Sequence, residues 1–158
     1  VMHATEGRAM VLRTSWVYSR FGNNFVKTML RLMVERSSIT VVVDQIGSPT
    51  WAGGLAELLW SACDRPGLTG PFHWTDAGTA SWYDFAIAVQ EEAEAVGILD
   101  QDCAIHPILG DDYPTLAQRP RYSVLDTTSS CEALGVEATH WRRQLRTMLQ
   151  ELHEYGED

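Results

Sequence analysis

Side chains that commonly carry catalysis are few in this sequence, and their spacing matches no familiar catalytic motif. Lysine occurs once, as Lys27, and the residue four positions before it is Asn23, so no Tyr-x-x-x-Lys pair exists for lysine-assisted acid chemistry. No Gly-x-Gly-x-x-Gly turn, P-loop or Gly-x-Ser-x-Gly elbow is present, and these are the signatures of phosphate cradles and serine nucleophiles. We interpret His73, His106 and the adjacent carboxylates at 111–112 as structural or solvated groups. Because these motifs are absent, motif analysis assigns the chain no catalytic centre of its own.

Length and charge restrict the partners further. The 158 residues suffice for one domain with a sizeable core, and 12 Lys and Arg oppose 21 Asp and Glu, a formal net charge of −9. An acidic surface repels nucleic-acid phosphates and anionic lipids, so we expect neither nucleic acid nor membrane as a partner. No segment resembles a signal peptide or reaches the roughly 18 apolar residues that span a bilayer. Cys63, Cys103 and Cys131 are too widely spaced for a zinc site. We therefore expect a cytoplasmic protein with buried free thiols.

Strand-like and helix-like segments alternate along the chain, which indicates the α/β class. Segments rich in β-branched and aromatic residues predict strands at 9–18, 39–44, 71–76 and 103–109. Apolar residues at helical spacing predict helices that begin near residues 25, 51, 82, 127 and 140. Ser81 and Asp84 fit a capping box, and Gly97 is suited to end the helix that they start. We expect Leu59 and Trp82 on the inner faces of their helices.

Five short motifs occur in the order in which one enzyme family carries them. They are RTSWVY at 13–18, NFVKTML at 24–30, DQIGSPT at 44–50, SWYDFA at 81–86 and RPRYSVLD at 119–126. Over residues 9–149 the chain thus resembles the C-terminal half of dTDP-4-dehydrorhamnose reductase, an extended short-chain dehydrogenase family.

The resemblance implies a fold and a division of the chain. The fold would be α/β, the C-terminal part of an extended short-chain dehydrogenase, with a truncated NAD(P)-binding Rossmann-type sheet and a mostly helical substrate-binding subdomain. Residues 1–158 would form a single domain. Within it, 9–20 and 52–77 resemble the end of the Rossmann sheet, and 21–51 and 78–158 resemble the substrate-binding subdomain.

The resemblance also implies a reaction for the complete family enzyme, the NADPH-dependent reduction of the 4-keto group of a nucleotide-linked 6-deoxysugar to give dTDP-L-rhamnose. Because the cofactor loop and the Tyr-x-x-x-Lys pair are absent here, we expect this chain to hold no cofactor and no catalytic residue. It would bind the dTDP-sugar and be inactive alone. Two alternatives remain: a non-catalytic binding or regulatory module of the same fold, and a gene fragment that binds nothing.

Three residues near the first strand are candidates for ligand contact. Trp16 comes at the end of that strand, where α/β folds place ligands, and an indole suits a sugar face. Asn24 and Phe25 open a helix whose free N–H groups favour an anion. The alternatives are a core position for Trp16 and simple helix capping by Asn24.

Five further candidates lie in two loops. Gln45, Gly47 and Ser48 could contact a base or ribose, although Gly47 and Pro49 could equally fix a tight turn. Either Arg119 or Arg121 could bind the diphosphate, because a guanidinium pairs with phosphate through two hydrogen bonds. A buried ion pair with Asp126 is the structural alternative.

Several positions depart from the family pattern. Ser19 replaces a Gly, Gly53 and Gly54 stand where Arg-Asp is common, and Leu116 and Gln118 replace a Pro and an Arg. The change at 118 removes a cation near the expected diphosphate site. Strands cut from a larger sheet would leave an open edge, so we expect the chain to self-associate or to be covered by a cofactor domain.

Overall fold

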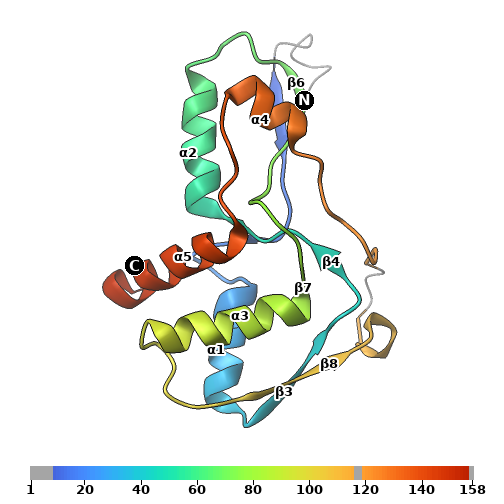
Figure 1. Cartoon of the computed structure of the whole chain (residues 1–158), viewed down its shortest axis with the longest axis vertical. Coiled ribbons are helices and arrows are strands. Elements are labelled where there is room, and N and C mark those ends of the chain that lie inside the picture. Colours follow the sequence, from blue (N-terminus) through green and yellow to red (C-terminus); the bar gives the residue numbers. More distant parts are fainter. Residues whose placement is uncertain (1–8, 116–118, 157–158) are drawn as a thin grey trace.

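The strands pair in twos rather than in one broad sheet. The computed structural model describes residues 9–115 and 119–156, and Figure 1 shows their arrangement. Three pairs are parallel and one is antiparallel. The parallel pairs are β1 (Met10–Arg13) with β6 (Gly70–His73), β2 (Val17–Tyr18) with β5 (Thr50–Trp51), and β3 (Ser38–Val42) with β8 (Ala104–Ile108); β4 (Ile46–Gly47) pairs antiparallel with β7 (Ala80–Ser81). Parallel pairing through helical crossovers confirms the predicted α/β class.

Helices form at each of the five predicted places. They are α1 (Phe25–Glu35), α2 (Ala52–Cys63), α3 (Trp82–Ala95), α4 (Thr128–Leu134) and α5 (Trp141–Tyr155), and a 3-10 turn, η1, covers Gly110–Asp112. The capping box is confirmed, because the Ser81 hydroxyl accepts from the Asp84 N–H and the Asp84 carboxylate accepts from the Ser81 N–H. This reciprocal cap fixes the start of α3.

The buried residues gather in two clusters. The larger cluster lies among α1, α3, α5 and the β3–β8 pair and includes the fully buried Tyr18, Phe85 and Leu145. The smaller cluster, built on Leu58, Trp74 and Leu134, lies where α2 and α4 pack beside β1 and β6. Figure 1 shows these groups at opposite ends of an elongated molecule. The predicted division of the chain between sheet and subdomain remains a prediction. Among the described residues, no helix has both the length and the apolarity to cross a membrane.

Several local predictions are wrong in detail. The strand expected at 9–18 is interrupted before Val17, because Trp16 adopts a left-handed backbone conformation with φ +51°. The strand expected at 71–76 ends at His73, and residues 74–76 are buried but lie outside any strand. Leu59 is 45% exposed rather than buried, and of the three free cysteines Cys63 is exposed.

The two glycines that depart from the family pattern have a packing reason here. A Cβ atom built at Gly53 would lie 2.3 Å from Cζ2 of Trp51, and one at Gly54 would lie 2.7 Å from Nε2 of Gln144. The missing side chains therefore let the Trp51 ring and α5 lie close to the start of α2. This contact offsets the lower helix propensity of glycine.

A buried carboxyl group lies at the start of α2. Asp76 is 3% exposed, and one of its oxygens accepts the Trp51 N–H at 2.9 Å, just before α2. Burial raises the pKa of Asp76 from 3.8 to about 7, although the hydrogen bond from Trp51 opposes the shift. Ionisation is thus less favourable in the folded state than in the unfolded one.

This shift predicts a pH-dependent stability. The contribution of a raised carboxyl pKa is complete below about pH 4 and is lost as the pH rises through 7. Asp76→Asn should therefore gain stability relative to the wild type by on the order of 2–4 kcal/mol between pH 4 and pH 8. Urea unfolding at several pH values measures the difference, with the exposed Asp100→Asn as control. Parallel stability curves for wild type and Asp76→Asn would refute the assignment.

Candidate functional site

Three aromatic rings from distant parts of the chain meet beside the β3–β8 pair. The indoles of Trp16 and Trp82 are stacked, with centroids 3.5 Å apart and planes within 7°. Phe25, the first residue of α1, lies 4.7 Å from the Trp82 ring at an angle of 45°. These rings pack against the larger core cluster but remain partly buried. Trp82, expected on the inner face of its helix, does pack against the core cluster, and it also lines the surface cavities described next.

Two cavities adjoin these rings. The larger has a volume of about 250 Å³ and the smaller about 200 Å³. The larger is lined by Phe25, Met29, Thr40, Val41, Val42, Gln45, Trp82, Tyr113, Thr115 and Arg119. The smaller is lined by Trp16, Gln45, Trp82, Arg119, Pro120 and Ser123. Gln45, Trp82 and Arg119 line both cavities, so the two adjoin along these side chains.

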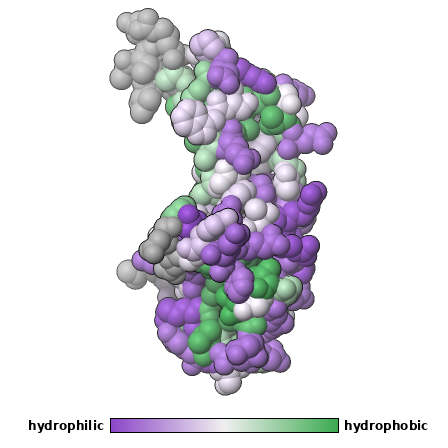
Figure 2. All heavy atoms as spheres, turned by 90° about the vertical axis from the view of Figure 1, so that its left-hand side faces the viewer, coloured by the Kyte–Doolittle hydropathy of each residue, from purple (hydrophilic) through white to green (hydrophobic). Residues whose placement is uncertain are grey.

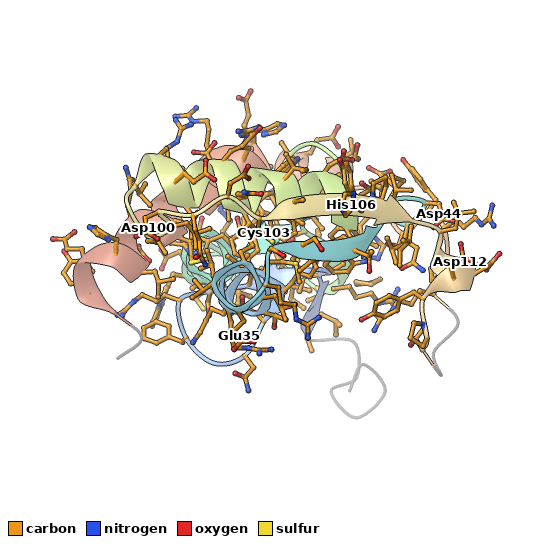
Figure 3. All side chains as sticks on the ribbon, turned by 90° about the horizontal axis from the view of Figure 1, so that it is seen from below. Glu35, Asp44, Asp100, Cys103, His106 and Asp112 are labelled. Carbon is orange, nitrogen blue, oxygen red and sulfur yellow. The ribbon has the colours of Figure 1, made fainter. Side chains whose placement is uncertain are left out.

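The cavities lie where the parallel strands β3 and β8 end. Figure 3 shows Asp44 and Asp112, which follow these strands, at one end of the pair, with Glu35 and Asp100 towards the other end. The Asp44 carboxylate accepts the Gly110 N–H at 2.7 Å and so ties the two strand ends together. Carboxyl ends of parallel strands are the usual place for ligands in α/β folds.

Four of the eight candidate residues line these cavities: Trp16, Phe25, Gln45 and Arg119. Gly47 lies directly against Trp16, because a Cβ atom there would come within 2.4 Å of the indole. The position has no space for a side chain. Gly47 therefore shapes the site through the close approach that it allows.

The other three candidates have structural partners. The Asn24 side chain accepts the Lys27 N–H at 3.2 Å and caps α1, which confirms the capping alternative. Ser48 is 2% exposed, and its hydroxyl donates to the carbonyl oxygen of Gly78 at 2.8 Å. The segment around Ser48 forms the short strands β4 and β5 instead of a tight turn. Direct ligand contact by Asn24 and Ser48 remains a prediction.

Arg121 is held by two carboxylates at the rim. Its guanidinium lies 3.7 Å from Asp44 and 3.5 Å from Asp111. Arg121 does not form the alternative, a buried pair with Asp126; hydrogen bonds from the side chain and the N–H of Thr128 instead lower the pKa of the Asp126 carboxylate. These carboxylates partly neutralise Arg121 and leave Arg119 as the cation on the cavity wall.

The lining combines flat apolar rings with one cation. Arg119 is the only charged side chain among the described lining residues of either cavity. Leu116 and Gln118, the two departures in the preceding loop, lie outside the described residues. Within 9–115 and 119–156, no three His, Cys, Asp or Glu side chains are placed to hold a metal ion. Such a site can bind a planar, partly apolar molecule that carries negative charge.

Sequence reasoning missed some lining residues. Tyr113 and Thr115 follow η1 in a loop that carried no motif, and Met29 and Val42 read as ordinary core residues. The one signal in the sequence for a further lining residue was the position of Trp82 in the first turn of a capped helix. Whether that turn faces the core or a cavity depends on long-range packing.

Known proteins provide an independent comparison. The family described as RmlD substrate binding domain matches residues 1–154. The chain is 43% identical over 146 residues to a dTDP-4-dehydrorhamnose reductase of Aggregatibacter actinomycetemcomitans, covering 89% of this chain and 50% of that protein. It is 40% identical to the spore coat polysaccharide biosynthesis protein SpsK of Bacillus subtilis, covering 96% and 50%.

A solved structure agrees with these relatives. The crystal structure of dTDP-4-dehydrorhamnose reductase from Bacillus anthracis in complex with NADP superposes with a TM-score of 0.82 at 33% identity, covering 90% of this chain and 48% of that one. The chain therefore spans about half the length of the relatives that it matches.

Proposed function

Since this chain belongs to the RmlD substrate binding domain family, we propose that it binds the dTDP-sugar of a dTDP-4-dehydrorhamnose reductase in the two adjoining cavities. One observation carries the proposal. Trp16, Phe25, Gln45 and Arg119, which the sequence motifs singled out, line two adjoining cavities although they are far apart in the chain.

The lining suits each part of such a ligand. The apolar walls of the larger cavity, with Phe25 and Val42, fit a thymine base. In the smaller cavity Trp16 supplies an apolar part of the wall beside the deoxysugar, and the Gln45 amide can donate to or accept from a sugar hydroxyl. Arg119 reaches both cavities, as a group that binds the diphosphate between base and sugar must do. The chain would thus bind and orient the substrate.

The described residues do not fit the nicotinamide cofactor of the reaction. Lys27, the single lysine, lies in the first turn of α1 and donates to the Arg20 carbonyl oxygen at 3.3 Å. No Gly-x-Gly-x-x-Gly turn exists in the sequence to cradle a dinucleotide pyrophosphate. We therefore assign this chain no step of the reduction. NADPH would belong to the cofactor-binding part of the complete enzyme.

An exposed apolar surface supports the need for a further part. Trp60 is 76% exposed and Leu59 45% exposed on the outer side of α2, and among the described residues β1 pairs with β6 alone. Figure 2 shows apolar side chains among polar ones on the face that carries α2 and α5. We propose that a second copy or the cofactor-binding part covers this region. The three cysteines without disulfides fit a reducing cytoplasm.

Replacing Arg119 tests the proposed binding. Arg119→Ala should weaken dTDP binding about 10- to 100-fold, because a charge-assisted contact to phosphate is lost. Isothermal titration calorimetry measures the affinity. Arg31→Ala is the matched control, since it removes the same charge from the exposed face of α1. Equal affinities for the two variants would contradict a diphosphate role for Arg119.

A further inference from the structure

The backbone of Trp16 is held in a conformation that tryptophan rarely adopts. Its φ of +51° is the only positive φ of a non-glycine residue within the described part of the chain. Such a conformation persists only where the surroundings fix it. Here the Trp16 carbonyl oxygen accepts the Thr50 N–H at 3.1 Å, and the indole lies against Gly47.

Trp82 completes this arrangement from another element. Its ring is parallel to the Trp16 indole at 3.5 Å, close enough for full contact between the two faces. Trp82 is itself well fixed, because the capping box sets the first turn of α3 and Phe25 packs against its ring. The Trp16 ring is thus enclosed between Gly47 and Trp82.

The two cavities depend on this stack to different degrees. Trp16 lines the smaller cavity only, whereas Trp82 lines both, and the larger one is otherwise formed mainly by α1, β3 and Tyr113. A displaced Trp16 ring would change the shape of the smaller cavity and leave most of the larger one intact. We propose that Trp82 is a positioning residue that fixes the Trp16 indole as a preformed wall for the sugar, so that the stack sets the preference for the sugar-linked nucleotide over the free nucleotide. The proposal rests on the proposed function.

Ligand binding by variants of Trp82 distinguishes the positioning role of this residue from the proposed function. Trp82→Ala should weaken dTDP-rhamnose binding about 10-fold and dTDP binding only about 3-fold, because Trp82 itself lines both cavities but the Trp16 wall that it fixes is lost only for the sugar. Trp82→Phe, which keeps a smaller stacking ring, should recover most of the loss. Thermal melting of each variant checks that the fold is retained.

Circular dichroism reports on the stack directly. Two parallel indoles in contact couple their ultraviolet transitions and give a paired positive and negative band near 230 nm. The pair should disappear in Trp82→Phe and in Trp16→Phe, but remain in Trp60→Phe, which removes an exposed tryptophan of α2.

The outcomes discriminate between the claims. Two results for Trp82→Ala would overturn the positioning role while leaving the proposed function in place. One is an equal loss of affinity for dTDP and dTDP-rhamnose, and the other is unchanged affinity for both ligands. A wild-type chain that binds neither ligand would refute the proposed function and the sugar preference together. A band pair that survives in both stack variants would overturn the stack itself.

Discussion

Replacing Arg142 and Arg146 together with alanine is expected to lower the free energy of unfolding by about 3 kcal/mol at pH 7. Both guanidinium groups, on α5, bind Glu92 of α3, whose side chain is only 2% exposed. Arg146 contacts both carboxylate oxygens, at 2.6 and 3.0 Å, and Arg142 contacts one at 2.7 Å. Without them the carboxylate would remain buried with no opposite charge.

The pH dependence identifies the cause of this loss. The hydrogen bond from Arg146, with smaller contributions from Arg142, lowers the pKa of Glu92 from its usual value of 4.5. The stabilisation is therefore present above pH 4.5 and is lost as the pH falls through the lower folded value. The difference between wild type and double variant should therefore shrink as the pH falls below 4. Urea unfolding gives both values. Arg143→Ala, on the same helix and exposed, should change stability little. A loss independent of pH would contradict the account.

Gly47→Ala is expected to weaken dTDP-rhamnose binding about 10- to 100-fold. The added methyl group would lie 2.4–2.7 Å from three atoms of the Trp16 indole. Because Trp82 is stacked on the same indole at 3.5 Å, the ring has little space to move away. Gly47 is not among the glycines with a positive φ, so the expected effect of alanine comes from its contact with the indole and not from backbone strain.

Titration calorimetry measures the affinity, and Gly67→Ala provides the control because no atom lies within 4 Å of a Cβ placed there. If the strands β4 and β7 shift to relieve the contact while the Trp16 ring stays in place, the Gly47 variant should also lose about 1–3 kcal/mol of stability. Wild-type affinity in a folded Gly47→Ala protein would show that the contact between Gly47 and Trp16 does not shape the site.

Local signals in the sequence predicted the helices well. The capping box at Ser81 and the apolar spacing of α1 and α5 involve residues within a few positions, so their physics is contained in the sequence itself. The structure confirms them, with Val26, Met33, Leu145 and Met148 fully buried. The motifs that carried the family resemblance were equally local.

Features that depend on distant partners could not be predicted. The strand at 9–18 is broken at Trp16 because the indole turns to meet Gly47 and Trp82, which lie more than 30 residues away. Trp82 read as a core residue because helical spacing places it on the inner face, and spacing does not distinguish a core from the wall of a hollow. Leu59 is 45% exposed although helical spacing places it beside the buried Leu58. In each case the outcome depends on tertiary contacts, which local sequence patterns do not contain.

The central claim, that this chain supplies the substrate site without the cofactor site, has a direct test. Calorimetric titration of dTDP-rhamnose and of NADPH into the wild-type chain, each separately, measures both affinities. We predict binding of dTDP-rhamnose, shared by dTDP, and no heat from NADPH beyond dilution. Binding of NADPH, or the absence of binding by both dTDP ligands, would contradict the claim.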